Sequence, residues 1–120
     1  MNRKHHNLKS WQRAIDLVND IYLETKNFPK QELYVLNAQM RRAVISIPSN
    51  IAEGAARNSD REFIQYLTIA RGSLSELETQ VLISKKLGYL QDETHLIKKI
   101  DDIFGLINGL INSIKQRNEE

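Results

Sequence analysis

Apolar residues recur along this chain at alternating steps of three and four positions, which is the spacing of one face of an α-helix. The alternation typical of strands is absent, and only two prolines and five glycines interrupt the pattern. The pattern predicts four helices, over residues 9–26, 30–56, 60–87 and 93–116. Long amphipathic helices joined by short turns favour an all-α, antiparallel up-down-up-down four-helix bundle. We therefore expect a single domain over residues 1–120.

Local signals mark where these helices begin and end. Pro29 suits the opening of the second helix. The sequence Ser-Asp-Arg-Glu at residues 59–62 has the form of a capping box that opens the third helix. Gly88 is the expected left-handed stop of that helix, and Asp92 is expected to cap the fourth. Three glycines fall inside helices and are expected to allow close helix approach: Gly72, Gly105 and Gly109.

The second helix carries the clearest apolar line, and a proline lies in the middle of it. The line keeps its phase on both sides of Pro48, which a helix end would have no reason to preserve. An interior proline costs roughly 3 kcal/mol, because it donates no hydrogen bond and its ring crowds the preceding turn. We expect the helix to continue through Pro48 with a kink. The line runs through Leu33, Leu36, Met40, Val44, Ile47, Ile51 and Ala55, and its counterpart on the first helix through Trp11, Ile15, Val18, Tyr22 and Thr25.

A second, partly apolar line lies beside the first on the same helix, with Arg41 among its members. One interpretation is a wide face that is buried in the core. The other is that this line meets another subunit. The second interpretation makes Tyr34, Ile45, Pro48 and Ala52 candidates for an oligomer interface. The pattern leaves both interpretations open.

The amino-acid composition limits the classes of protein to which the chain can belong. With 120 residues, of which 41% are hydrophobic, the chain can bury a modest core. It has no cysteine, which excludes disulfides, thiolate zinc sites and a cysteine nucleophile and is compatible with a reducing cytoplasm. No apolar run approaches the ~20 residues that a membrane span needs. We expect a cytoplasmic protein with no membrane partner.

Positive charge is concentrated in the first half of the chain. Residues 1–57 carry nine lysines and arginines against five acids, whereas residues 58–120 carry eight against ten. Guanidinium groups pair well with phosphate oxygens, so this half is a candidate for contact with RNA or DNA. For any single residue, a solvated face or a salt bridge is the competing interpretation. The candidates are Arg41, Arg42, Arg57, Arg61 and Arg71, with Lys4, Lys9 and Arg13 adding to the N-terminal end.

The residue pattern offers no support for catalysis. There is no glycine-rich phosphate loop, no His-Glu-x-x-His pair and no thiol. Asp92 and His95 have the spacing of a metal pair, but they sit at one helix end without a second copy, so a capping aspartate beside an exposed histidine is the better interpretation. We expect neither an enzyme nor a bound cofactor or metal.

Several strings of the sequence carry a resemblance that covers nearly the whole chain. They include Ser-Ile-Pro-Ser-Asn-Ile-Ala-Glu-Gly at residues 46–54, Ala-Arg-Gly-Ser-Leu at residues 70–74 and Leu-Gly-Tyr-Leu at residues 87–90. With these strings the chain resembles the bacterial four-helix-bundle family of ribosomal-RNA intervening-sequence proteins. Similar proteins include the accessory variability determinant proteins of diversity-generating retroelements. One departure is Val35, where the family often has glycine.

The resemblance implies a four-helix protomer that assembles into a ring of five, with a basic surface and, in the retroelement relatives, nucleic-acid binding. The family name records where some of the genes lie and is not an activity. Two classes of function therefore stay open. The first is an oligomeric, non-enzymatic accessory protein that binds nucleic acid through a basic surface without strong sequence specificity. The alternative is a protein-interaction scaffold that binds a partner protein and has no nucleic-acid role.

Overall fold

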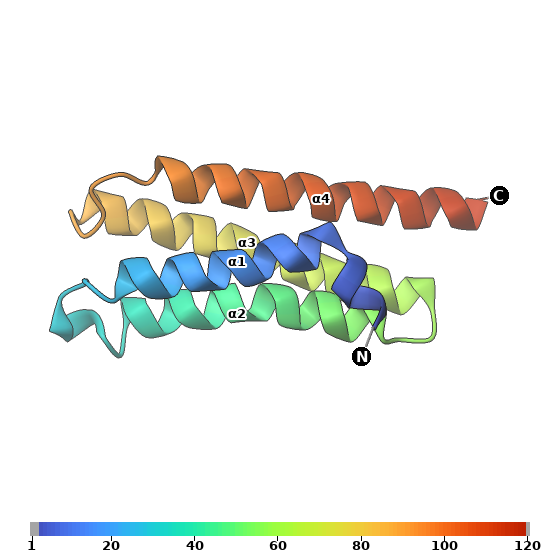
Figure 1. Ribbon diagram of the computed structural model, residues 1–120, viewed down its shortest axis with the longest axis horizontal. Helices are drawn as coiled ribbons and strands as arrows, with labels where there is room; N and C mark the ends of the chain where they lie inside the picture. The colour runs from blue at the N-terminus through green and yellow to red at the C-terminus, as the bar shows by residue number, and fades with distance from the viewer. Residues whose placement is uncertain (1–2, 120) are drawn as a thin grey trace.

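The computed structural model of the protein describes residues 3–119 and contains four long α-helices (Figure 1). The part of the chain that it describes contains no strand. The predicted all-α helical bundle is therefore confirmed. The elements are η1 (Lys4–Asn7), α1 (Lys9–Thr25), η2 (Lys30–Glu32), α2 (Leu36–Ala55), α3 (Asp60–Lys86) and α4 (Thr94–Glu119), where η marks a short 3₁₀ turn.

Each helix lies lengthwise against two neighbours. α1 packs against α2 and α4, and α3 packs against the same two helices. Figure 1 shows the connections at alternating ends of the bundle, so the chain reverses direction between successive helices. The body is a rod with principal extents of 51 × 26 × 21 Å. One core of mostly aliphatic side chains, contributed by all four helices, runs along it.

α2 turns its predicted apolar line into this core. The helix continues through Pro48, as the unbroken phase of the line predicts. The kink at Pro48 stays a prediction. Leu33, which was expected on the same line, lies before the helix and is exposed. The buried members of the line are Met40, Val44, Ile47, Ile51 and Ala55.

The start of α2 differs from the range that the pattern predicts. Residues 30–32 form a 3₁₀ turn, and the α-helix begins only at Leu36. Phe28 is buried and packs against Tyr89, with 5.4 Å between the ring centroids. The Tyr89 hydroxyl donates a hydrogen bond to the Glu32 carboxylate at 2.8 Å. These contacts with the α3–α4 connection hold the segment across the end of the bundle, where a longer α2 would not fit them.

The core-facing side of α1 is one step away from the predicted line. Ile15 and Tyr22 were expected in the core but are 43% and 38% exposed, so this part of the prediction is wrong. α1 carries two apolar lines, and its contact with both α2 and α4 selects the line that lies between them. The other line stays at the surface beside α2. The buried residues of α1 are Ser10, Ala14, Leu17, Ile21 and Thr25.

The predicted cap at Ser59 and the predicted stop at Gly88 are confirmed, and Asp92 accepts a hydrogen bond at the start of α4. The Ser59 hydroxyl accepts a hydrogen bond from the Glu62 backbone N–H at 3.2 Å, which caps α3. Gly88 follows that helix with φ of +82°, a conformation that glycine adopts without strain. The Asp92 carboxylate accepts from the Thr94 N–H at 2.9 Å at the start of α4, and this hydrogen bonding lowers the pKa of Asp92.

The glycine that allows close helix approach is Gly54. A Cβ atom at this position would lie 2.7 Å from the Tyr66 Cβ and 3.2 Å from the Phe63 carbonyl oxygen, so α2 and α3 meet here with no room for a side chain. The prediction for the other three helical glycines is wrong, because a Cβ would meet nothing within 4 Å at Gly72, Gly105 or Gly109.

Replacing Gly54 therefore has an effect opposite to that of replacing Gly72. Gly54→Ala should lower the free energy of unfolding by about 1–3 kcal/mol, because the methyl group forces the α2 and α3 backbones apart. Gly72→Ala, the matched control, should raise it by about 1 kcal/mol, because alanine is the better helix former at an open position. Urea unfolding followed by circular dichroism at one protein concentration measures both. A Gly54→Ala protein as stable as the wild type would contradict the close approach.

Candidate functional site

α1 and α2 leave an apolar groove between them at the surface. Its volume is about 420 Å³, and it is open along one side. α1 supplies the line that it does not bury in the core, and α2 supplies its second apolar line. Among the lining side chains only His5 titrates. The lining residues are His5, Trp11, Ile15 and Val18 on one side and Ile45, Pro48, Ser49 and Ala52 on the other.

The groove brings together three of the four candidates for an oligomer interface. Ile45, Pro48 and Ala52 lie at successive turns of α2 and line the groove. Ile45 is 43% exposed, whereas the Pro48 ring is buried beneath the surface. The fourth candidate, Tyr34, precedes α2 and lies outside the groove with 88% of its surface exposed. The structure therefore separates Tyr34 from the other three.

Sequence reasoning missed the half of the groove that α1 provides. Trp11, Ile15 and Val18 were recognised as an apolar line but were assigned to the core. The signal that could have placed them is the second line of the same helix, through Ala14, Leu17 and Ile21, which competes for the core position. Two apolar lines on one helix indicate that one of them faces something other than the core.

Three of the five candidate arginines have partners within the protein. The Arg41 Nε donates to the Thr25 hydroxyl at 3.0 Å, and its guanidinium lies 4.4 Å from the centre of the Tyr22 ring. These contacts join the end of α1 to α2. Arg71 on α3 donates to the Asn108 side-chain oxygen on α4 at 2.8 Å.

Of these three arginines, Arg57 at the end of α2 makes the most contacts. Its guanidinium forms an ion pair with Glu53 at 2.6 Å and donates to the Tyr66 hydroxyl at 2.7 Å. It also lies 4.9 Å from the centre of the Tyr66 ring. The Tyr66 hydroxyl and the Glu53 carboxylate together hold the pKa of Arg57 above its usual value. Arg57 thus connects α2 to α3 near their closest approach.

Arg42 and Arg61 differ from these three. Both side chains are exposed, and among the side chains of residues 3–118 neither has a hydrogen-bond, ion-pair or stacking partner. Their guanidinium groups keep all their donors available to solvent or to a bound anion. The five arginines thus divide into three that join helices and two that face outward.

A comparison of the sequence with models of protein families identifies the family to which the chain belongs. The family model of the 23S rRNA-intervening sequence proteins matches residues 6–109. The protein belongs to this family. The resemblance drawn from its residue strings is therefore confirmed, and the matched span includes all five arginines and every groove residue except His5. Among curated proteins, no match to the sequence was found.

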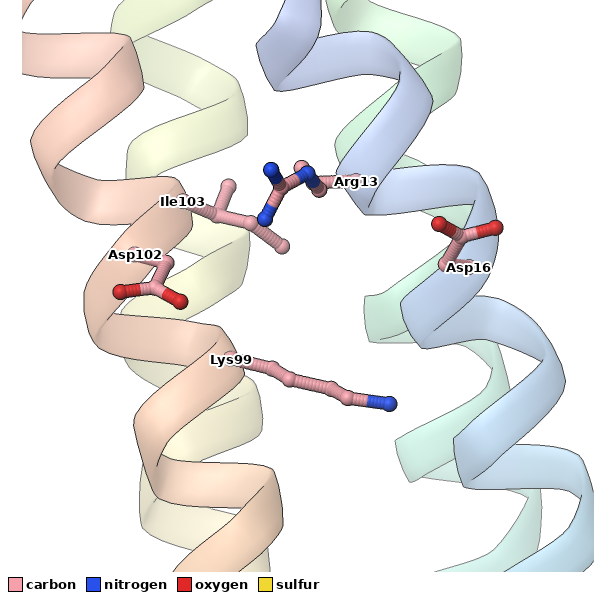
Figure 2. Close-up of a pocket in the computed structure, with 5 residues that line it drawn as sticks. All are labelled: Arg13, Asp16, Lys99, Asp102 and Ile103. Carbon is pink, nitrogen blue, oxygen red and sulfur yellow. The ribbon is translucent and has the colours of Figure 1, made fainter.

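A second hollow of this intervening-sequence protein lies between α1 and α4 and has a volume of about 210 Å³. Figure 2 shows Arg13 reaching from α1 toward Ile103 and Lys99 projecting from α4 toward α1. The lining mixes two cations, Arg13 and Lys99, with the carboxylates of Asp16 and Asp102. Such balanced charge favours neither an anion nor a cation as a ligand.

The same pair of helices is joined by ion pairs further along. The Lys99 ammonium lies 2.6 Å from the Asp20 carboxylate, and the His95 imidazole lies 3.1 Å from Glu24. The hollow is therefore part of a polar contact between α1 and α4. In the described part of this intervening-sequence protein, no group of three or more potential ligand side chains could hold a metal ion, and no helix is long and apolar enough to cross a membrane.

Proposed function

We propose that the protein is a non-enzymatic, cytoplasmic accessory protein that assembles with copies of itself and binds nucleic acid without strong sequence specificity. The observation that carries the proposal is the apolar groove between α1 and α2. Its lining is apolar along two helices, yet nothing within the described chain fills it. Exposed apolar surface of this kind typically marks an interaction site.

A second copy of the chain is the occupant that we propose for the groove. All the groove residues except His5 come from two long helices, which suits a contact repeated identically between subunits. We further propose five copies, because the family resemblance implies a ring of five. A ring needs a heterologous contact, in which the groove of one subunit meets a different surface of the next. Each subunit of the ring would then bury the groove of its neighbour.

The arginines support the nucleic-acid part of the proposal. Arg42 and Arg61 have no partner among the side chains of residues 3–118, and assembly repeats each of them once per subunit. Few exposed aromatic rings are available for base stacking in residues 3–118: the Phe63 ring is buried, guanidinium groups lie over the Tyr22 and Tyr66 rings, and Tyr34 is exposed. We therefore propose that the protein contacts phosphates and accepts RNA or DNA of any sequence.

One observation favours the alternative of a protein-interaction scaffold without a nucleic-acid role. Arg41, Arg57 and Arg71 are held by partners on neighbouring helices, so their charge already serves the fold. A scaffold would still use the groove, and its partner would be another protein. The two functions differ in whether the assembled protein binds nucleic acid at low salt.

Ile45→Glu should weaken self-assembly at least tenfold. The substitution places a carboxylate inside the apolar groove, where an unpaired charge costs more than the ~1.4 kcal/mol that corresponds to a factor of ten. Light scattering at micromolar concentration should give a mass of several protomers for the wild type, five under the ring proposal, and a smaller mass for the variant.

The matched control is Ile69→Glu. Ile69 is 51% exposed on α3, away from the groove, so the same chemical change there shows how much mass is lost when a carboxylate is placed on exposed apolar surface outside the groove. A wild-type protein that is monomeric at this concentration would contradict the assembly, and an Ile45→Glu protein with the wild-type mass would contradict the groove as its site.

Binding to nucleic acid should be electrostatic. The logarithm of the affinity should fall linearly with the logarithm of the salt concentration, with a slope of about −0.9 for each neutralised phosphate on duplex DNA. Arg42→Glu combined with Arg61→Glu should lower affinity uniformly for unrelated RNA and DNA sequences and make that slope shallower. Fluorescence anisotropy at two or more salt concentrations measures both quantities.

A variant with the same change in net charge separates a local from a global effect. Lys98 and Lys115 are exposed on α4, and Lys98→Glu combined with Lys115→Glu should lower affinity less than the arginine pair does. If both double variants lose the same affinity, the arginines have no special role. The absence of binding at low salt would leave the scaffold as the function.

A further inference from the structure

The N-terminal turn, residues 3–7, folds back over one end of the groove. Figure 1 shows the turn in dark blue, crossing from the start of α1 to the C-terminal end of α2. The His5 ring lies edge-on to Trp11 with 5.0 Å between ring centroids, and the His6 ring lies 5.4 Å from the same indole. Two adjacent histidines thus cover Trp11, which lines the groove.

Two of the hydrogen bonds that hold this turn in place are accepted by His6. The Arg3 backbone N–H donates to the His6 Nδ1 atom at 3.1 Å, and the Gln12 side-chain amide donates to the His6 carbonyl oxygen at 2.7 Å. The Lys4 ammonium lies 4.7 Å from the centre of the Phe63 ring. His6 occupies the position at which a capping box has glutamate or glutamine, whose side chain accepts the same backbone hydrogen bond.

This hydrogen bond depends on the protonation state of His6. A neutral imidazole can accept at Nδ1, but a protonated imidazole donates from both nitrogens and accepts from neither. Protonation therefore removes the cap and places the Arg3 N–H against an N–H of His6. A second positive charge on the adjacent His5 ring, 4.5 Å away between centroids, would add repulsion.

The surroundings do not compensate for positive charge on the two rings. In the groove, α1 presents Trp11 to His5 and α2 presents Ser49 and Ala52, none of which titrates. Among the side chains of residues 3–118, no carboxylate forms an ion pair with either histidine, and Glu53, which follows the groove residue Ala52 on α2, is bound to Arg57. From α3, the turn meets the uncharged Phe63 ring through Lys4.

Burial in the turn and the positive charges of His6 and Arg3 lower the pKa of His5 from its ordinary value of 6.5. A lowered histidine pKa means that the closed turn favours the neutral ring. The closed turn is therefore fully stabilised above pH 6.5 and loses this stabilisation as the pH falls below that value.

We propose that the N-terminal turn is a proton-operated clasp: with His5 and His6 neutral it covers Trp11 and closes one end of the groove, and protonation releases it. Release uncovers the indole and lengthens the open groove. The clasp itself does not depend on the function proposed above, whereas its control over access for a second copy rests on the assembly at the groove.

Trp11 reports the clasp directly, because it is the single tryptophan of the chain. Its fluorescence emission maximum should move to longer wavelength when the wild type is titrated from about pH 7.5 to about pH 5.0, since release exposes the indole to water. A protonated histidine that stayed in contact would change the intensity of the emission but not its wavelength. An unchanged emission maximum would overturn the proposal.

A locked variant keeps the contacts and removes the titration. His5→Phe keeps an aromatic ring against Trp11, and His6→Gln supplies the usual capping-box acceptor for the Arg3 N–H. The combined variant should show no wavelength shift over the same pH range. The third histidine, His95, is paired with Glu24 between α1 and α4, and His95→Gln should retain the full shift. A shift in the locked variant, or its loss in His95→Gln, would refute the clasp.

Two further measurements separate the clasp from unfolding and from assembly. Circular dichroism should show an unchanged helix signal over the titration; a helix loss with the same midpoint would mean that the fold, not the turn, responds. The wild type, diluted below the concentration at which it assembles, should still show the wavelength shift. A shift that occurs only in the assembled protein would report dissociation and would contradict a clasp within one chain.

Discussion

The close contact between α2 and α3 decides which way every face of α2 points. At Gly54 the two backbones approach so closely that no Cβ fits, and the Ser46 and Ser73 hydroxyls meet at 2.8 Å further along the same contact. With Ser46 and Gly54 against α3 and its main apolar line in the core, α2 has another side that carries Ile45, Pro48 and Ala52. α1 packs beside it and completes the groove. The surface that we propose for assembly therefore follows from the orientation in which α2 packs against α3.

Periodicity was sufficient to predict the features that depend on neighbours along the chain. It predicted four helices, the core line of α2 through Pro48, the cap at Ser59 and the stop at Gly88, because each rests on residues within a few positions of one another. It failed for features that depend on contacts between segments far apart in the sequence. α1 has two apolar lines, and its packing against both α2 and α4 selects between them. The start of α2 is held back by the hydrogen bond between Glu32 and Tyr89, which lie 57 residues apart.

The candidate site was predictable to the same extent and for the same reason. Ile45, Pro48 and Ala52 share a groove because helical spacing already places them on one face, whereas Tyr34 precedes the helix and leaves that face. The arginines show more clearly what local sequence patterns cannot predict. Arg41 and Arg71 have partners 16 and 37 residues away, so no local pattern could separate them from the exposed Arg42 and Arg61. In an accessory protein of this kind, most of the cationic candidates would hold the bundle together, and few would remain for phosphate.

The central claim is that a second copy of the chain covers the groove in solution, and thiol protection tests it most directly. The chain has no cysteine, so Ser49→Cys places a single, nearly isosteric thiol in the groove, and Ser113→Cys places one on the exposed face of α4 as a control. The alkylation rate of the Ser49→Cys protein should fall as the protein concentration rises, because assembly buries the groove, while the rate of the Ser113→Cys protein should stay constant. Equal rates at all concentrations for the groove thiol would contradict the claim.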